Sequence, residues 1–125
     1  MPEKQIEILI VEDDPFLMKI MGNRLQEEGY FVDKSEDGED AIKRIKEDGY
    51  SLVLLDLIMP KKTGFEVLKE LKETGEKTPV LVFTNSAQDE DRKEVLSLGA
   101  KGYFVKSDIA MDELVEIVKK FIITI

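Results

Sequence analysis

Five short apolar runs alternate along the chain with five segments in which apolar residues recur at helical spacing. The runs are rich in Val, Ile, Leu and aromatic residues, which is typical of buried strands. They lie at 6–11, 30–34, 52–55, 79–84 and 102–105. Apolar residues three or four apart in the intervening segments predict amphipathic helices. These run over 16–28, from after Gly38 to near Gly49, from Thr63 or Gly64 to Leu71, and over 89–98 and 111–121.

A strand followed by a helix, five times over, is the pattern of a parallel sheet covered by helices on both faces. Parallel neighbours need crossover connections, which are right-handed, and the four helices between successive strands provide them. The unbroken apolar runs at 52–55 and 79–84 suit strands that are buried on both faces. We therefore expect an α/β protein of the flavodoxin-like (βα)5 type, a three-layer sandwich with strand order 2-1-3-4-5.

The composition indicates one domain over residues 1–125, with 42% hydrophobic residues, and we expect no output domain in this chain. Acidic residues outnumber basic ones 27 to 18, which gives a net charge of −9. This balance argues against nucleic acid or membrane as direct partners, because phosphate contacts need clustered Lys and Arg. No stretch resembles a signal peptide or a membrane span, so we expect a cytoplasmic protein. Cys and His are both absent, so any chemistry must depend on carboxylates, hydroxyls and amines.

Polar groups follow four of the predicted strands at the point where each strand ends. They are the acidic triplet 12–14, then Asp56, Thr84 and Lys106. Each has an ordinary explanation when taken alone: helix N-terminal acids, a loop residue, a strand residue and a surface ammonium. In the expected strand order, however, the carboxyl ends of these strands are neighbours at the edge where such sheets bind ligands. We therefore expect the four groups to share one pocket.

This set of groups predicts a particular chemistry. Carboxylates held close together raise one another's pKa or require a counter-cation, and oxygen ligands without His or Cys favour Mg²⁺ over zinc or copper. A carboxylate beside Mg²⁺, an ammonium and a hydroxyl can attack phosphorus and form an acyl phosphate. No general base is needed, because an ionised carboxylate has no proton to lose. The sequence thus predicts phosphoryl transfer onto Asp56.

The chain resembles the receiver domains of two-component response regulators over nearly its whole length. The resemblance is carried by the run 8–14, by Asp56 with Met59 and Pro60, by Gly64, by Thr84 and by the segment 99–106. It implies that Asp56 is the phosphoacceptor. It further implies that Asp13 ligates Mg²⁺ directly, that Glu12 acts largely through water, and that Ile58 lends its backbone carbonyl.

The same resemblance implies roles for three further residues. Lys106 would pair with Asp56 before phosphorylation and then contact the phosphoryl group. Thr84 would move toward that group, and Tyr103 would turn inward as the output switch, although a half-buried aromatic on an edge strand is an equally good reading of Tyr103.

The function implied is a phosphorylation-activated signalling switch that catalyses only its own phosphotransfer and slow dephosphorylation. A histidine kinase or histidine phosphotransfer protein would supply the phosphoryl group. A surface formed by the fourth helix, fifth strand and fifth helix would then bind a downstream protein or a second copy of the chain.

Three positions depart from the family pattern, and two others lie where the family tunes the lifetime of the phosphoryl group. Ser107 stands where the family usually has Pro after the lysine; a cis bond before serine would cost about 2.5–4 kcal/mol, so we expect a differently shaped loop. Asn85 replaces a small residue and is expected to narrow access to the pocket, while Asp14 is expected to cap the first helix. The residues two past the acceptor and two past the threonine, Ile58 and Ser86, tune phosphoryl lifetime in the family. An apolar Ile58 should admit water poorly and predicts a long-lived phosphoryl group.

Two other classes of function stay open. A haloacid-dehalogenase-like phosphatase also uses a nucleophilic Asp, but it needs an Asp-x-Asp-x-Thr arrangement and a cap domain, which the acidic triplet and the chain length do not provide. A degenerate receiver that acts only as a binding scaffold would lack some of the reactive groups, whereas Asp13, Asp56, Thr84 and Lys106 are all present.

Overall fold

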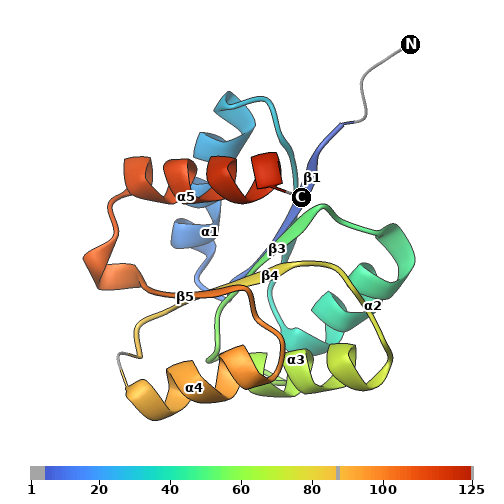
Figure 1. Cartoon of the computed structure of the whole chain (residues 1–125). Coiled ribbons are helices and arrows are strands. Elements are labelled where there is room, and N and C mark those ends of the chain that lie inside the picture. The colour runs from blue at the N-terminus through green and yellow to red at the C-terminus, as the bar shows by residue number, and fades with distance from the viewer. Residues whose placement is uncertain (1–4, 87, 125) are drawn as a thin grey trace.

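A computed structural model describes residues 5–86 and 88–124. Strands and helices alternate through the chain, as the hydrophobic pattern predicts, and Figure 1 shows their arrangement. The elements are β1 (Glu7–Val11), α1 (Pro15–Glu27), β2 (Phe31–Ser35), α2 (Gly38–Asp48), β3 (Leu52–Leu55), α3 (Gly64–Glu73), β4 (Val80–Thr84), α4 (Asp89–Ser97), β5 (Gly102–Val105) and α5 (Met111–Thr124).

The five strands form one parallel sheet in the order β2-β1-β3-β4-β5. This confirms the predicted flavodoxin-like (βα)5 fold. The central strands β1, β3 and β4 are buried almost throughout, so their uninterrupted apolar runs reflect helices on both faces of the sheet. No helix in the described part of the chain combines the length and the apolar character that crossing a membrane requires.

Each face of the sheet has its own hydrophobic core. Helices α2, α3 and α4 cover one face and α1 and α5 cover the other (Figure 1). Successive strand residues alternate between the two cores: Leu9 and Val11 belong to the first, Ile8 and Ile10 to the second. The site residues at the strand ends are thus held by a sheet that is packed from both sides.

Element ends agree closely with the sequence pattern, with two differences. Helix α5 continues to Thr124, three residues past the predicted end, because Phe121 and Ile122 still pack against the second core. A 3-10 turn at Lys106–Asp108, which the pattern did not predict, follows β5 directly.

Asp14 caps α1 as expected: its side chain accepts hydrogen bonds from the backbone N–H groups of Phe16 (2.9 Å) and Leu17 (3.3 Å).

Candidate functional site

The sheet register brings the predicted polar groups to the same edge. Val11 is paired with Leu55, and the backbone N–H of Asp56 donates to the carbonyl of Val11 at 3.1 Å. On the other side of β3, Thr84 is paired with Val105, so that Lys106 comes one residue after the pair. The acidic triplet, Asp56, Thr84 and Lys106 therefore all lie at the carboxyl ends of adjacent strands.

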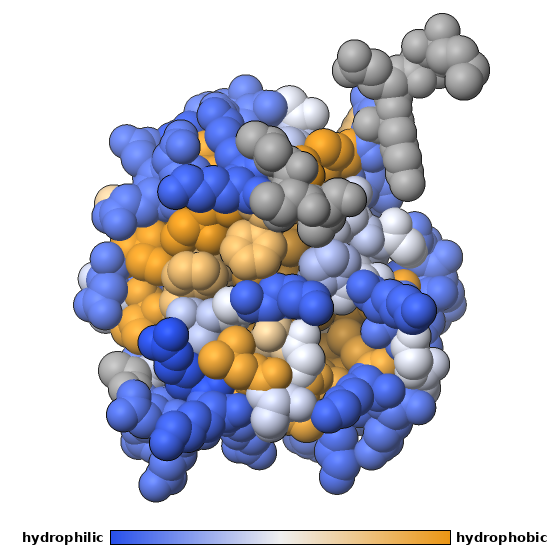
Figure 2. Space-filling model, in the orientation of Figure 1, coloured by the Kyte–Doolittle hydropathy of each residue, from blue (hydrophilic) through white to orange (hydrophobic). Residues whose placement is uncertain are grey.

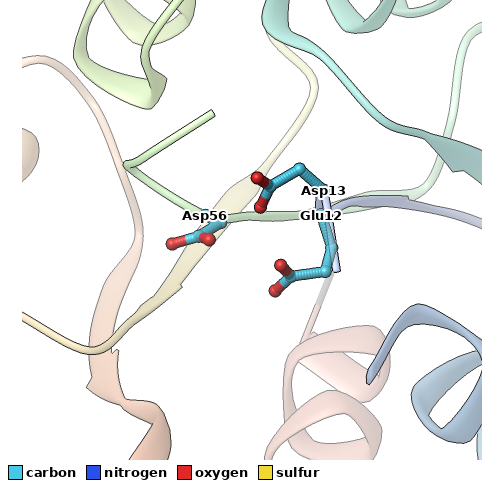
Figure 3. A group of neighbouring side chains, drawn as sticks. All are labelled: Glu12, Asp13 and Asp56. Carbon is cyan, nitrogen blue, oxygen red and sulfur yellow. The ribbon is translucent and has the colours of Figure 1, made fainter. Parts of the chain in front are cut away.

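Three carboxylates meet at the junction of β1 and β3. One oxygen from each of Glu12, Asp13 and Asp56 lies within 4.8 Å of the others, and their carboxyl groups face a common space (Figure 3). Glu12 is 3% exposed and Asp56 is 8% exposed, whereas Asp13 is exposed to solvent. Carboxylate repulsion at this spacing favours the binding of a cation.

Lys106 supplies the positive charge in the cluster. Its ammonium donates to Oδ2 of Asp56 at 3.1 Å and also to Oε1 of Glu12. The second oxygen of Glu12 accepts from the backbone N–H of Asp14 at 3.1 Å. Both oxygens of Glu12 are therefore engaged within the protein. The sequence interpretation assigned Lys106 to Asp56 and did not include its contact with Glu12.

The environment shifts the pKa values of this pair. Burial raises the pKa of Glu12 above its ordinary value, and the hydrogen bond from Lys106 offsets only part of the effect. Burial also acts to lower the pKa of Lys106, but the hydrogen bond to Glu12 and the charge of Asp56 outweigh it and raise that pKa. Lys106 is therefore held as a cation.

The backbone around Asp56 is closely packed. Its Oδ1 accepts from the N–H of Leu57 at 2.8 Å, so each carboxylate oxygen has one donor. The N–H of Gly64 donates to the carbonyl of Leu57 at 2.8 Å. A Cβ at Gly64 would lie 2.4 Å from the carbonyl oxygen of Asp56, a distance that no side chain tolerates. Glycine at this position allows the start of α3 to pack directly on the backbone of Asp56.

Thr84 and Tyr103 are connected through Ser86. Thr84 is fully buried and its hydroxyl accepts from the N–H of Ser86 at 3.4 Å. The hydroxyl of Tyr103 donates to the carbonyl of Ser86, and the Ser86 hydroxyl donates to Asp91 in the first turn of α4. A chain of hydrogen bonds thus runs from the end of β4 to α4 and β5. No pattern in the sequence predicts the hydrogen bond from Ser86 to Asp91.

Three other positions that the sequence singled out, Ile58, Asn85 and Ser107, lie outside the buried cluster. The side chain of Ile58 is 72% exposed and Asn85 is also exposed. Ser107 lies within the 3-10 turn that follows β5, and no cis peptide bond occurs among the described residues.

The donor set fits a hard divalent cation. The clustered groups are carboxylate oxygens alone, with no nitrogen or sulfur ligand among them, which suits Mg²⁺ better than a transition metal. Asp13 carries the exposed carboxylate of the three, whereas both oxygens of Glu12 and both oxygens of Asp56 already accept hydrogen bonds within the protein.

The sequence profile of the response regulator receiver domain matches residues 8–119. The transcriptional regulatory protein DltR of Streptococcus agalactiae is 38% identical over 101 residues, which are 81% of this chain and 45% of that protein. The gliding motility regulatory protein of Myxococcus xanthus is 30% identical over 119 residues, which are 94% of this chain and 15% of that protein. The chain thus spans less than half the length of these curated relatives.

Solved structures of similar chains share the fold. The receiver domain of the Francisella response regulator 1452 superposes with a TM-score of 0.88 at 25% identity, covering 94% of this chain and 97% of that one. A CheY-like response regulator receiver domain protein from Methanospirillum hungatei gives a TM-score of 0.88 at 25% identity, covering 95% of this chain and 94% of that one. These likenesses agree with the profile match.

Proposed function

Because the chain belongs to the response regulator receiver domain family, we propose that it is a phosphorylation-activated switch whose phosphoacceptor is Asp56. The observation that carries the proposal is the position of Asp56: it is nearly buried at the end of a central strand, beside two further acids and in contact with Lys106. A structural aspartate at a strand end would not need this set of charged neighbours.

The reaction follows from the groups present. An oxygen of the Asp56 carboxylate attacks phosphorus, a P–N bond to the donor's histidine breaks, and the electron pair leaves with the imidazole. Lys106 neutralises negative charge on the phosphoryl oxygens, and the hydroxyl of Thr84 donates to one of them. The product is an aspartyl phosphate. Asp56 needs no base, which accords with a chain that contains no histidine.

Receiver domains generally bind Mg²⁺ at an acidic pocket, and this chain has such a cluster. In the proposal Asp13 and Asp56 hold the ion, with Glu12 acting through water and Ile58 through its backbone carbonyl. The bound ion would supply positive charge for the phosphoryl oxygens. The exposed carboxylate of Asp13 supports its part in this assignment.

The output of the switch is proposed to run through Tyr103 to the surface formed by α4, β5 and α5. The hydrogen bonds from Thr84 through Ser86 to Tyr103 and Asp91 support this path. Figure 2 shows apolar side chains gathered over β5 between α4 and α5, framed by polar ones. A hollow of about 280 Å³ on this surface is lined by residues of α4, β5 and the turn after it. A downstream protein or a second copy of the chain would bind here.

The test is phosphorylation by a small-molecule donor. The protein is incubated with phosphoramidate and Mg²⁺ and its intact mass is measured, with Asp56→Asn and magnesium-free samples alongside. Asp89→Asn is the matched control, since Asp89 is an exposed aspartate on α4 that does not belong to the cluster of Glu12, Asp13 and Asp56. One base-labile phosphoryl adduct that is lost only in Asp56→Asn and without Mg²⁺ supports the proposal.

Two results would favour the other classes of function. No adduct, with Mg²⁺ binding demonstrated by calorimetry, would favour a scaffold that does not accept phosphate. Multiple turnover of an external phosphate ester would favour a phosphatase.

A further inference from the structure

The loop between β3 and α3, residues 57–63, rests on the first turn of α2. A Cβ built on Gly38 would lie 2.2 Å from the carbonyl oxygen of Lys62 and 2.9 Å from its carbonyl carbon. Both atoms belong to the backbone, so a side chain at this position could be accommodated only if the loop or the helix moved. Gly38 lies 18 residues before Asp56 and outside the strand-end cluster.

The two ends of the loop are hydrogen-bonded to each other, which restricts how the loop can move. At its ends, the N–H of Gly64 donates to the carbonyl of Leu57 at 2.8 Å. Within it, the N–H of Lys62 donates to the carbonyl of Pro60 at 2.8 Å. Lys61 has a φ of 67°, the only left-handed non-glycine residue among those described. Such a conformation is unfavourable for lysine and persists where surrounding structure enforces it.

We propose that Gly38 is a positioning residue for the loop of residues 57–63. Because Gly38 has no side chain, the backbone of Lys62 can pack directly against α2. Through the closed loop, this contact fixes Leu57, Ile58 and the carboxylate of Asp56. The part that concerns phosphorylation rests on the proposed function. A methyl group at Gly38 pushes Lys62 outward. Because the loop is closed between Leu57 and Gly64, the movement is passed to the residues that adjoin Asp56.

The central comparison is Gly38→Ala against Gly75→Ala. Gly75 follows α3 at its far end, has a φ of 75° and has no atom within 4 Å of its built Cβ. Alanine there strains the backbone and lowers stability without touching the loop. The pair therefore separates positioning from general destabilisation, which thermal melting of both variants measures.

We expect Gly38→Ala to slow phosphorylation by phosphoramidate about tenfold or more at saturating Mg²⁺, since small misplacements of reacting groups have large kinetic costs. Calorimetry on the unphosphorylated variant should show weaker Mg²⁺ binding by about threefold or more, because the proposed ligands adjoin the loop. Gly75→Ala should match the wild type in both measurements. If Gly38→Ala has the wild-type rate and the wild-type Mg²⁺ affinity, the proposal is overturned.

A second measurement uses the unmodified protein and stays decisive if Gly38→Ala does not fold. Coupling between the loop and α2 is reciprocal, so Mg²⁺ with beryllium fluoride, a phosphoryl mimic, should shift the backbone amide resonances of Gly38 and Glu39 along with those of the loop. Shifts confined to the loop would refute the proposed coupling of Lys62 to Gly38. If the wild type accepts no phosphoryl group, the proposed function fails. Mg²⁺ alone still tests the coupling of Lys62 to Gly38, through the amide resonances of Gly38 and Glu39 and through calorimetry on Gly38→Ala.

Discussion

Replacement of Lys106 by Met tests how the acidic cluster is held together. The substitution keeps most of the side-chain volume and removes the charge. It leaves Glu12 and Asp56 without the ammonium that both now contact, and these carboxylates are 3% and 8% exposed. Removing one partner of a fully buried ion pair costs about 3–5 kcal/mol. Because the Lys106 side chain is 16% exposed and water reaches the cluster, we expect a smaller loss of about 2–3 kcal/mol.

Urea unfolding followed by circular dichroism, in EDTA near pH 7.5, measures this loss. With a slope of about 2 kcal/mol per molar urea, the midpoint should fall by roughly 1–1.5 M. Lys119→Met is the matched control: Lys119 pairs with Glu28 at the surface and its side chain is 41% exposed. That variant should lose much less stability than Lys106→Met, because exposed ion pairs contribute little to folding.

The loss of stability in Lys106→Met should change with pH, and the direction of the change can be predicted. The pKa of Glu12 is already raised in the folded protein, and loss of the ammonium raises it further. A carboxyl group with a raised folded pKa favours folding while it is protonated, and that contribution is lost as the pH rises through the folded pKa. The deficit of Lys106→Met should therefore be largest near pH 7.5 and shrink toward pH 5. A loss equal to that of Lys119→Met, or one that does not change with pH, would refute this reasoning.

Three further predictions concern separate parts of the molecule. Asp14→Ala removes the cap of α1 and should lower the free energy of unfolding by about 1 kcal/mol in urea titrations; no change would show that the cap contributes nothing. Tyr50→Phe removes the hydroxyl that donates to Asp33 at 2.7 Å and should cost about 1 kcal/mol. Burial and the hydrogen bond to Asp33 raise the pKa of Tyr50, so the same variant should lose a tyrosine ionisation that is shifted to higher pH in an absorbance titration. Ile58→Asn should shorten the lifetime of the aspartyl phosphate severalfold, measured by loss of the mass adduct, because the polar side chain admits water; an unchanged lifetime would contradict the role given to Ile58.

The fold could be predicted from the sequence because its determinants are local. Apolar runs such as 52–55 and 79–84 specify strands buried on both faces, and the helices between them leave few topologies for so short a chain. The strand ends then determine which residues share an edge. For this reason Glu12, Asp56 and Lys106 could be assigned to one site before their contacts were known.

Contacts between atoms were less predictable because they depend on differences of a few ångströms. Glu12 and Asp13 are adjacent acids that were both expected to serve the Mg²⁺ site, Asp13 directly and Glu12 largely through water, but the sequence did not indicate that Glu12 would be buried against Lys106 while Asp13 stays exposed. The approach of Gly38 to Lys62 joins two turns that no periodicity connects. The Ser86 to Asp91 hydrogen bond likewise depends on where the β4–α4 loop places a single hydroxyl.

The arrangement of charges gives a physical reason for the proposed dependence on a divalent cation. Three carboxylates share one ammonium, which contacts both Glu12 and Asp56, so the cluster carries an excess of negative charge. An incoming phosphoryl group is itself anionic, and in a largely buried site its repulsion is weakly screened. One divalent cation would balance the excess and leave Lys106 available for the phosphoryl oxygens. Because Asp13 carries the exposed carboxylate of the cluster, Asp13→Asn should weaken Mg²⁺ binding more than Glu12→Gln does in calorimetry. The opposite order would mean that Glu12 gives up Lys106 to bind the ion.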